Sequence, residues 1–235
     1  VNRFQVDEAR LEFADGNVPG ATAVGSARGE VDLLHPGDAK FHGLKVDLAH
    51  FDLRTPQFLN ADFPRLNGIV AGTAVLDSIW SDVRFHDADL THSDGDSTPV
   101  SRFEGAGRVT LGDQYVVADV TVAALPLSAT TLARSFPRIP LRGSYSGTLS
   151  VKGTVGDLSV TTDLVGDAGR VQLDGQFDAQ APRYRALARG EVAGLDFRRA
   201  LERSHAPTSS VNGRFAVRLE GDSLANLFGT VQLFV

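Results

Sequence analysis

The chain has 235 residues, of which 42% are hydrophobic and 22% are charged, and its net charge is -6. This composition is typical of a folded protein and too apolar for a disordered one. The negative charge argues against nucleic acid as a partner, because a nucleic-acid-binding surface must neutralise phosphates. The absence of cysteine excludes disulfide bonds, thiolate-bound zinc and a thiol nucleophile.

The two ends of the sequence predict a segment of a longer protein. The chain contains no methionine, begins at Val1, and ends at Val235 within an alternating apolar stretch. Its longest charge-free run, residues 120–133, has 14 residues and contains Pro126. This run is shorter than the ~20 residues that a helix needs to span a bilayer.

Apolar residues alternate at period two along the chain, which predicts strands with one buried face. Turn-forming groups such as Asp15-Gly16-Asn17 and Gly166-Asp167 separate these stretches. Because no long amphipathic helices alternate with the strands, the pattern favours an all-β, antiparallel fold over an α/β fold. The clearest alternating stretches are residues 44–48, 116–122, 158–160, 171–173, 215–219 and 231–235.

Three segments of the chain, 51–68, 125–143 and 195–213, follow one plan. Each predicts the end of a strand, a short helix closed by a proline, and a new strand that begins near a glycine. The expected helix N-caps are Thr55 (followed by Pro56), Ser128 and Asp196; the closing prolines are Pro64, Pro137 and Pro207; and the glycines are Gly68, Gly143 and Gly213.

These repeats divide the chain into a partial unit at 1–68, units at 69–143 and 144–213, and the start of a further unit at 214–235. A period of 70 to 75 residues fits five or six strands and a short helix. The expected fold is an elongated, curled antiparallel sheet, in which repeated units with short interspersed helices form a β-trough. A long sheet with one apolar face must curl, either into a closed sandwich or into an open trough that something else fills.

The passages at 149–160, 169–177, 190–197 and 211–221 resemble TamB and its AsmA-like relatives, large envelope proteins of Gram-negative bacteria. The resemblance is carried by glycines, alternating aliphatic residues and the short helix. It implies the periplasmic part of a protein whose inner-membrane anchor lies outside this segment. It also implies phospholipid transport between membranes and outer-membrane biogenesis, including assembly with an outer-membrane barrel protein.

The expected site is a groove that shields phospholipid acyl chains from water. Burying each methylene gains about 0.8 kcal/mol, so the transfer of one long acyl chain through water costs on the order of 10 kcal/mol. Such a groove needs no catalytic residue, metal or cofactor, and none is expected. The residues expected to face the lipid are Leu149, Val151, Leu158, Val160, Val171, Leu173, Phe177, Phe215, Val217, Leu219, Val231 and Leu233.

Other functions remain open at this stage. The same pattern fits a structural or adhesive repeat module with a closed core, because patterning alone does not separate a core from a groove. A carbohydrate-active β enzyme would need two carboxylates at working distance. The densest set of potential metal ligands lies at residues 86–96 and consists of His86, Asp87, Asp89, His92, Asp94 and Asp96. It fails the calcium-loop pattern, so the stretch favours a solvated hairpin loop.

Overall fold

The computed structural model describes residues 2–15, 18–33, 39–56, 66–79, 81–111, 116–136, 142–180, 182–201, 207–223 and 226–235. These residues form one antiparallel sheet of 13 strands, in which strand order follows chain order. The all-β antiparallel prediction is confirmed. The strands are β1 (Asn2–Asp15), β2 (Val18–Asp32), β3 (Lys40–Asp52), β4 (Ile69–Ile79), β5 (Asp82–Ser93), β6 (Ser101–Leu111), β7 (Val116–Ser128), β8 (Ser144–Thr154), β9 (Asp157–Gly166), β10 (Gly169–Asp178), β11 (Tyr184–Leu195), β12 (Val211–Gly221) and β13 (Phe228–Phe234).

The sheet has an apolar face and a polar face, which β11 shows clearly. Its residues Tyr184, Ala186, Ala188 and Val192 are buried on one face, whereas Arg185, Leu187, Arg189 and Glu191 point to the other face and are exposed. Side chains alternate between the two faces of a strand, and directly paired residues share a face. The pairing registers therefore show, for each of the remaining strands, which residues belong to the apolar face and which to the polar face.

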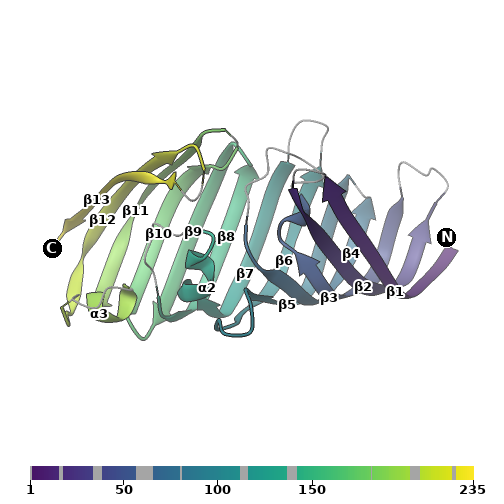
Figure 1. The fold of residues 1–235 in the computed structure, drawn as a ribbon, viewed down its shortest axis with the longest axis horizontal. Coiled ribbons are helices and arrows are strands. Elements are labelled where there is room, and N and C mark those ends of the chain that lie inside the picture. The colour runs from purple at the N-terminus through teal and green to yellow at the C-terminus, as the bar shows by residue number, and fades with distance from the viewer. Residues whose placement is uncertain are drawn as a thin grey trace.

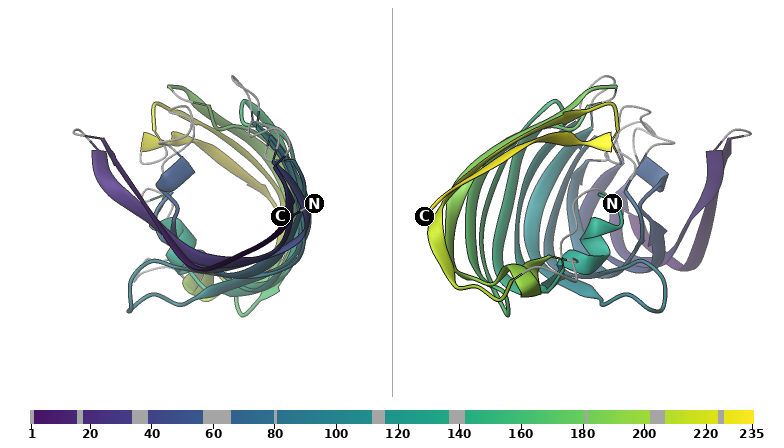
Figure 2. Two further views of the ribbon diagram at one scale, coloured as in Figure 1. Left: turned by 90° about the vertical axis from the view of Figure 1, so that its right-hand side faces the viewer. Right: turned by 60° about the vertical axis from the view of Figure 1, so that its left-hand side comes forward.

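The strands bend, so the sheet has a concave side (Figure 2). This side is the apolar face, because the short helices that lie on it pack against apolar residues such as Tyr145. The two short helices α2 (Ala129–Ala133) and α3 (Phe197–Ala200) lie on this side, and Ala129 and Ala200 pack with Tyr145 of the apolar face. The two ends of the chain lie at opposite ends of the long axis (Figure 1). The sheet is neither closed nor strongly curled, so the sequence expectation is confirmed only as an all-β antiparallel sheet with short helices.

Glycines on the apolar face mark where neighbouring strands approach most closely. Gly147 of β8 has φ +151, and a Cβ there would lie 2.0 Å from the carbonyl oxygen of Asp163. A Cβ at Gly72 of β4 would lie 2.1 Å from the carbonyl oxygen of Asp89. Glycine therefore permits this inward bend, as expected for glycine kinks in curved sheets.

Each of the two complete units predicted from the sequence contains four strands among its described residues, not the five or six expected from its length. Residues 69–143 form β4–β7 with α2, and residues 144–213 form β8–β11 with α3 before β12 begins. The expectation was wrong because the strands of these units have 10 to 13 residues, so fewer of them fit one period.

The helix caps agree with two of the three expected positions. Ser128 accepts a hydrogen bond from the backbone N–H of Thr131, and Asp196 from that of Arg198. In the predicted first unit, Asp52 accepts from the N–H of Arg54 at 2.9 Å, whereas Thr55 is already helical and its buried hydroxyl has no hydrogen-bond partner among the described residues. The predicted cap at Thr55 is therefore wrong.

The ends of the helices follow the predicted prolines only in part. The chain is already extended at Leu201, immediately after α3, so Pro207 does not end that helix. Pro64 and Pro137 lie outside the described residues. In the part of the chain that the structure describes, no helix has the length and apolar character to cross a membrane.

The enclosed core is small for a chain of this size. Two clusters of buried apolar residues occur, one around Tyr145, Ala168 and Ala200 and the other around Val31, Phe41 and Leu44. The molecule exposes 13722 Å² of surface, whereas a compact monomer of 25.0 kDa exposes about 10,000 Å². Most of the apolar face is therefore not enclosed by the described part of the chain.

Candidate functional site

Apolar side chains on the concave face form rows that cross the strands. In one central row every residue lies directly opposite the next one on the neighbouring strand, and none is polar. This row runs from β3 to β13 through Leu44, Leu76, Phe85, Gly107, Val120, Val151, Val160, Gly175, Ala188, Val217 and Val231.

Three further rows flank this one and are also free of charge. One includes Gly147, Leu164 and Val171, a second includes Leu149, Thr162 and Leu173, and a third includes Leu158, Phe177 and Leu219. Along a strand, neighbouring rows are two residues or about 7 Å apart, so four rows give an apolar band about 20 Å wide. We call these four rows the apolar band.

The few polar side chains within the band do not interrupt it. Thr162 donates its hydroxyl proton to the carbonyl oxygen of Thr148 at 2.8 Å, so this group is satisfied within the sheet. Ser78 lies between Phe41 and Val83, near one end of the row that contains Leu158 and Phe177. Hydrocarbon side chains or glycine occupy the paired positions on either side of both residues.

All twelve residues expected to face lipid lie in the apolar band. Ten of them are partly exposed, and Val231 and Leu233 on β13 are 69% and 36% exposed. None has the full burial of a core residue, because no second sheet of described residues lies over them. The structure therefore brings the predicted residues together on one accessible surface.

None of the twelve predicted residues lies before β8, so the part of the band on β3 to β7 was missed. On β4, β5 and β6, which contribute Leu76, Phe85 and Val109, the alternation itself was not recognised. Irregularities between Thr73 and Val75 and between Phe85 and Ala88 shift the register and break the period of two. A search that tolerated one inserted residue between alternating stretches would have found these strands, since β-bulges insert a single residue.

The opposite face carries the charges of the sheet. Arginine and aspartate side chains pair across strands, as in Arg170–Asp163 at 2.6 Å and Arg102–Asp89 at 2.7 Å. Hydrogen bonds from Arg170 and Gln172 lower the pKa of Asp163 from 3.8 to about 2. Charge is thus concentrated on the convex side, where it keeps the sheet in contact with water.

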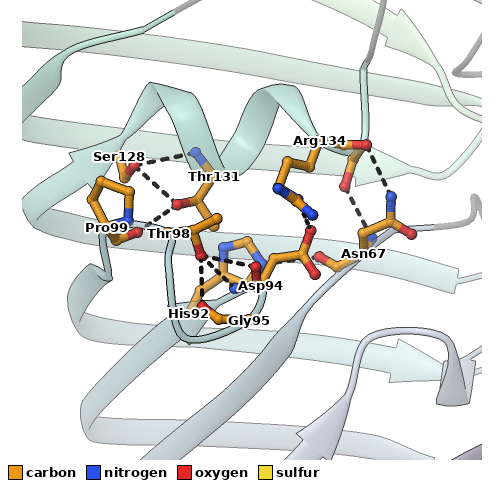
Figure 3. A network of polar contacts seen from close by, with 10 residues as sticks. Asn67, His92, Asp94, Gly95, Thr98, Pro99, Ser128, Thr131 and Arg134 are labelled. Atoms are coloured by element: carbon orange, nitrogen blue, oxygen red, sulfur yellow. Dashed lines mark hydrogen bonds and ion pairs between the residues drawn. The ribbon is translucent and has the colours of Figure 1, made fainter.

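A polar network joins α2 to two neighbouring segments at one rim of the apolar face (Figure 3). The carboxylate of Asp94 pairs with Arg134 at 2.6 Å, and the ring of His92 contacts the carbonyl oxygen of Asn67 at 3.0 Å. The hydroxyl of Thr131 donates to the carbonyl oxygen of Pro99. These contacts fix the helix at the edge of the band.

The potential metal ligands are not brought together. His86 lies between Asp77 and Asp87 on the polar face, with nitrogen–oxygen distances of 3.1 and 2.9 Å. Asp89 pairs with Arg102, while His92 and Asp94 belong to the network at the rim. Within the described ranges, no group of three or more His, Asp or Glu side chains is placed to hold a metal ion.

The role of the site is inferred from its own residues and their arrangement. No protein-family model, curated protein or solved structure matches the chain. What defines the site is a long, charge-free, concave band on one layer of sheet, bordered on one rim by two short helices.

Proposed function

We propose that the apolar band shields the acyl chains of phospholipids from water while the lipids move along the sheet. The supporting observation is the continuity of the band: hydrocarbon side chains or glycine face the concave side on strand after strand from β3 to β13. An exposed apolar surface of this extent marks an interaction site, because soluble proteins rarely leave such surfaces in water.

The dimensions of the band support an acyl chain as its ligand. The hydrocarbon core of a bilayer is about 30 Å thick, so one leaflet of acyl chains extends about 15 Å. A band about 20 Å wide therefore covers the full length of such a chain. The polar headgroup stays in water, and no charged residue in the four rows has to be desolvated.

The uniformity of the band suits movement better than tight binding. The twelve lipid-facing residues are Leu, Val or Phe, and similar residues follow at each step along the rows. A lipid that advances by one strand, about 4.8 Å, exchanges one set of aliphatic contacts for an equivalent set. No bond has to be made or broken, so the role that we propose is not enzymatic.

The resemblance to TamB and AsmA-like proteins supplies the proposed cellular setting. In this setting the chain is a segment of an inner-membrane-anchored protein that spans the periplasm of a Gram-negative bacterium. It contributes to outer-membrane biogenesis together with an outer-membrane barrel protein.

A photocrosslinking experiment tests the proposal at two adjacent residues. Leu173 points to the apolar face and Gln172 to the polar face, although they are neighbours on β10. A benzophenone amino acid at position 173 is expected to crosslink to phospholipid in vesicles or cell extract, and one at position 172 is not.

Mass spectrometry of the crosslinked species identifies the ligand. Phospholipid attached at both positions would show non-specific contact, and no phospholipid at position 173 would contradict the proposal. A peptide of this or another protein at position 173 would instead favour a structural module whose apolar face is closed by protein.

A further inference from the structure

Two residues at equivalent positions of successive units reach across a unit boundary to the helix of the next unit. Asn67 precedes Gly68 at the end of the first unit, and Arg142 precedes Gly143 at the end of the second. Asn67 contacts the end of α2, and Arg142 contacts α3. In both cases the residue before the closing glycine hydrogen-bonds at the C-terminal end of the following helix, although the acceptor groups differ.

Asn67 binds two groups just beyond the last turn of α2. Its backbone N–H donates to the hydroxyl oxygen of Ser135, and its side-chain amide donates to the carbonyl oxygen of Arg134, both at 2.9 Å (Figure 3). Ser135 is buried, so the first of these hydrogen bonds is shielded from water. Carbonyl groups at a helix end have no partner within the helix and need external donors.

Arg142 supplies such donors to α3. Its backbone N–H donates to the carbonyl oxygen of Ala200 at 2.9 Å, and its guanidinium donates to the carbonyl oxygens of Arg199 and Arg198. The helix has four residues, and a helix this short is not stable by its own hydrogen bonds. The donors from the preceding unit therefore account for much of its order.

The hairpin in the middle of each unit holds the same helix from the other side. Asp94 in the β5–β6 loop pairs with Arg134 beside α2, and the carbonyl oxygen of Asp167 in the β9–β10 turn accepts from Arg199 of α3 at 3.1 Å. Each helix is thus fixed by one residue of the unit before it and by one hairpin of its own unit.

We propose that Asn67 and Arg142 are fastening residues between units, each of which holds the helix of the following unit at the rim of the apolar face. The order of a helix then depends on the unit that precedes it in the chain. This assignment follows from the repeated contacts and does not depend on the proposed lipid function.

Amide hydrogen exchange of the whole chain tests the assignment, because the two substitutions act on different helices. Arg142→Ala is expected to speed exchange at residues 196–201 about tenfold and to leave residues 131–136 unchanged. Asn67→Ala is expected to have the reverse effect. Faster exchange confined to the mutated unit's own strands, a uniform increase, or no change would each overturn the assignment.

Conservative and control variants separate fastening from general destabilisation. Arg142→Lys retains a donor for one carbonyl group, so it is expected to recover part of the protection of α3. Arg189→Ala removes an arginine from the polar face of β11 and is expected to leave both helices unchanged. If Arg142→Ala does not fold, Arg142→Lys and Arg142→Gln take its place. Amide exchange of α3 at the original rate in both of these variants would contradict the assignment.

Discussion

Gly190 of β11 lies so close to Gln172 of β10 that a Cβ at position 190 would be 1.9 Å from the carbonyl oxygen of residue 172. The two residues belong to paired strands, and Gly190 faces the concave side between Leu173 and Phe215. The close approach of the backbones is thus part of the surface that forms the apolar band.

Gly190→Ala is expected to destabilise the fold by about 3 kcal/mol, because the methyl group forces the two strands apart. Urea denaturation followed by circular dichroism measures this loss. Gly156→Ala is the control, since a Cβ at position 156 would lie closest to the flexible end of the Gln180 side chain. The urea midpoint of this variant should change little. Equal stability of the two variants would show that the strands adjust without cost.

Leu173→Glu is expected to reduce phospholipid transfer between vesicles at least tenfold, because it places a charge in the path of the acyl chains. Fluorescent-lipid dequenching measures the rate. Gln172→Glu carries the same charge on the opposite face and should transfer lipid at the original rate. Val217→Glu and Ala216→Glu form a second matched pair on β12. Unaltered transfer by folded Leu173→Glu and Val217→Glu proteins would contradict the proposed function.

The ion pair between Arg170 and Asp163 predicts a specific acid response. The pKa of Asp163 is about 2, below its ordinary value of 3.8, because Arg170 and Gln172 hydrogen-bond the carboxylate. A lowered folded-state pKa stabilises the fold above pH 4, and this contribution is lost as the pH falls from about 4 to about 2. In Arg170→Gln, NMR titration should show the pKa of Asp163 moving toward 3.8. Arg214→Gln on β12 should leave it unchanged.

Ser128→Ala is expected to cost about 1–2 kcal/mol, because the hydroxyl caps α2 and this buried position cannot gain water instead. The backbone N–H of Thr131, 3.2 Å from the Ser128 hydroxyl, loses its acceptor in the variant. Chemical denaturation measures the change. Ser159→Ala on the polar face of β9 is exposed and should alter stability by less than about 0.5 kcal/mol.

Much of the fold could be predicted because the face of the sheet to which a side chain points depends only on its position along the strand. Alternation at 171–173 and 215–219 identified the residues of β10 and β12 that share one face, and the registers join them across β11. The N-caps at Ser128 and Asp196 were also visible from residue type. The hydrogen bond from the backbone N–H of Arg54 to Asp52 was not, because Thr55-Pro56 offered a good local cap pattern three residues later.

The number of strands in a unit depended on information beyond the local pattern. Strand length is set by how far two neighbours keep pairing, and bulges such as that opposite Ala74 allow pairing to continue where the alternation breaks. The interaction partners of isolated polar residues could not be predicted from the sequence either. Asp94 and Arg134 are 40 residues apart in the sequence and meet because α2 packs beside the β5–β6 loop.

The sequence by itself determined an all-β chain with one apolar face and a helix near the end of each repeat, since these properties follow from side-chain periodicity and capping chemistry. Tertiary structure decided that the apolar positions of successive strands align into continuous rows and that the face is left open. Register and curvature arise only when strands pair, through hydrogen bonds, bulges and the close backbone contacts that glycine permits.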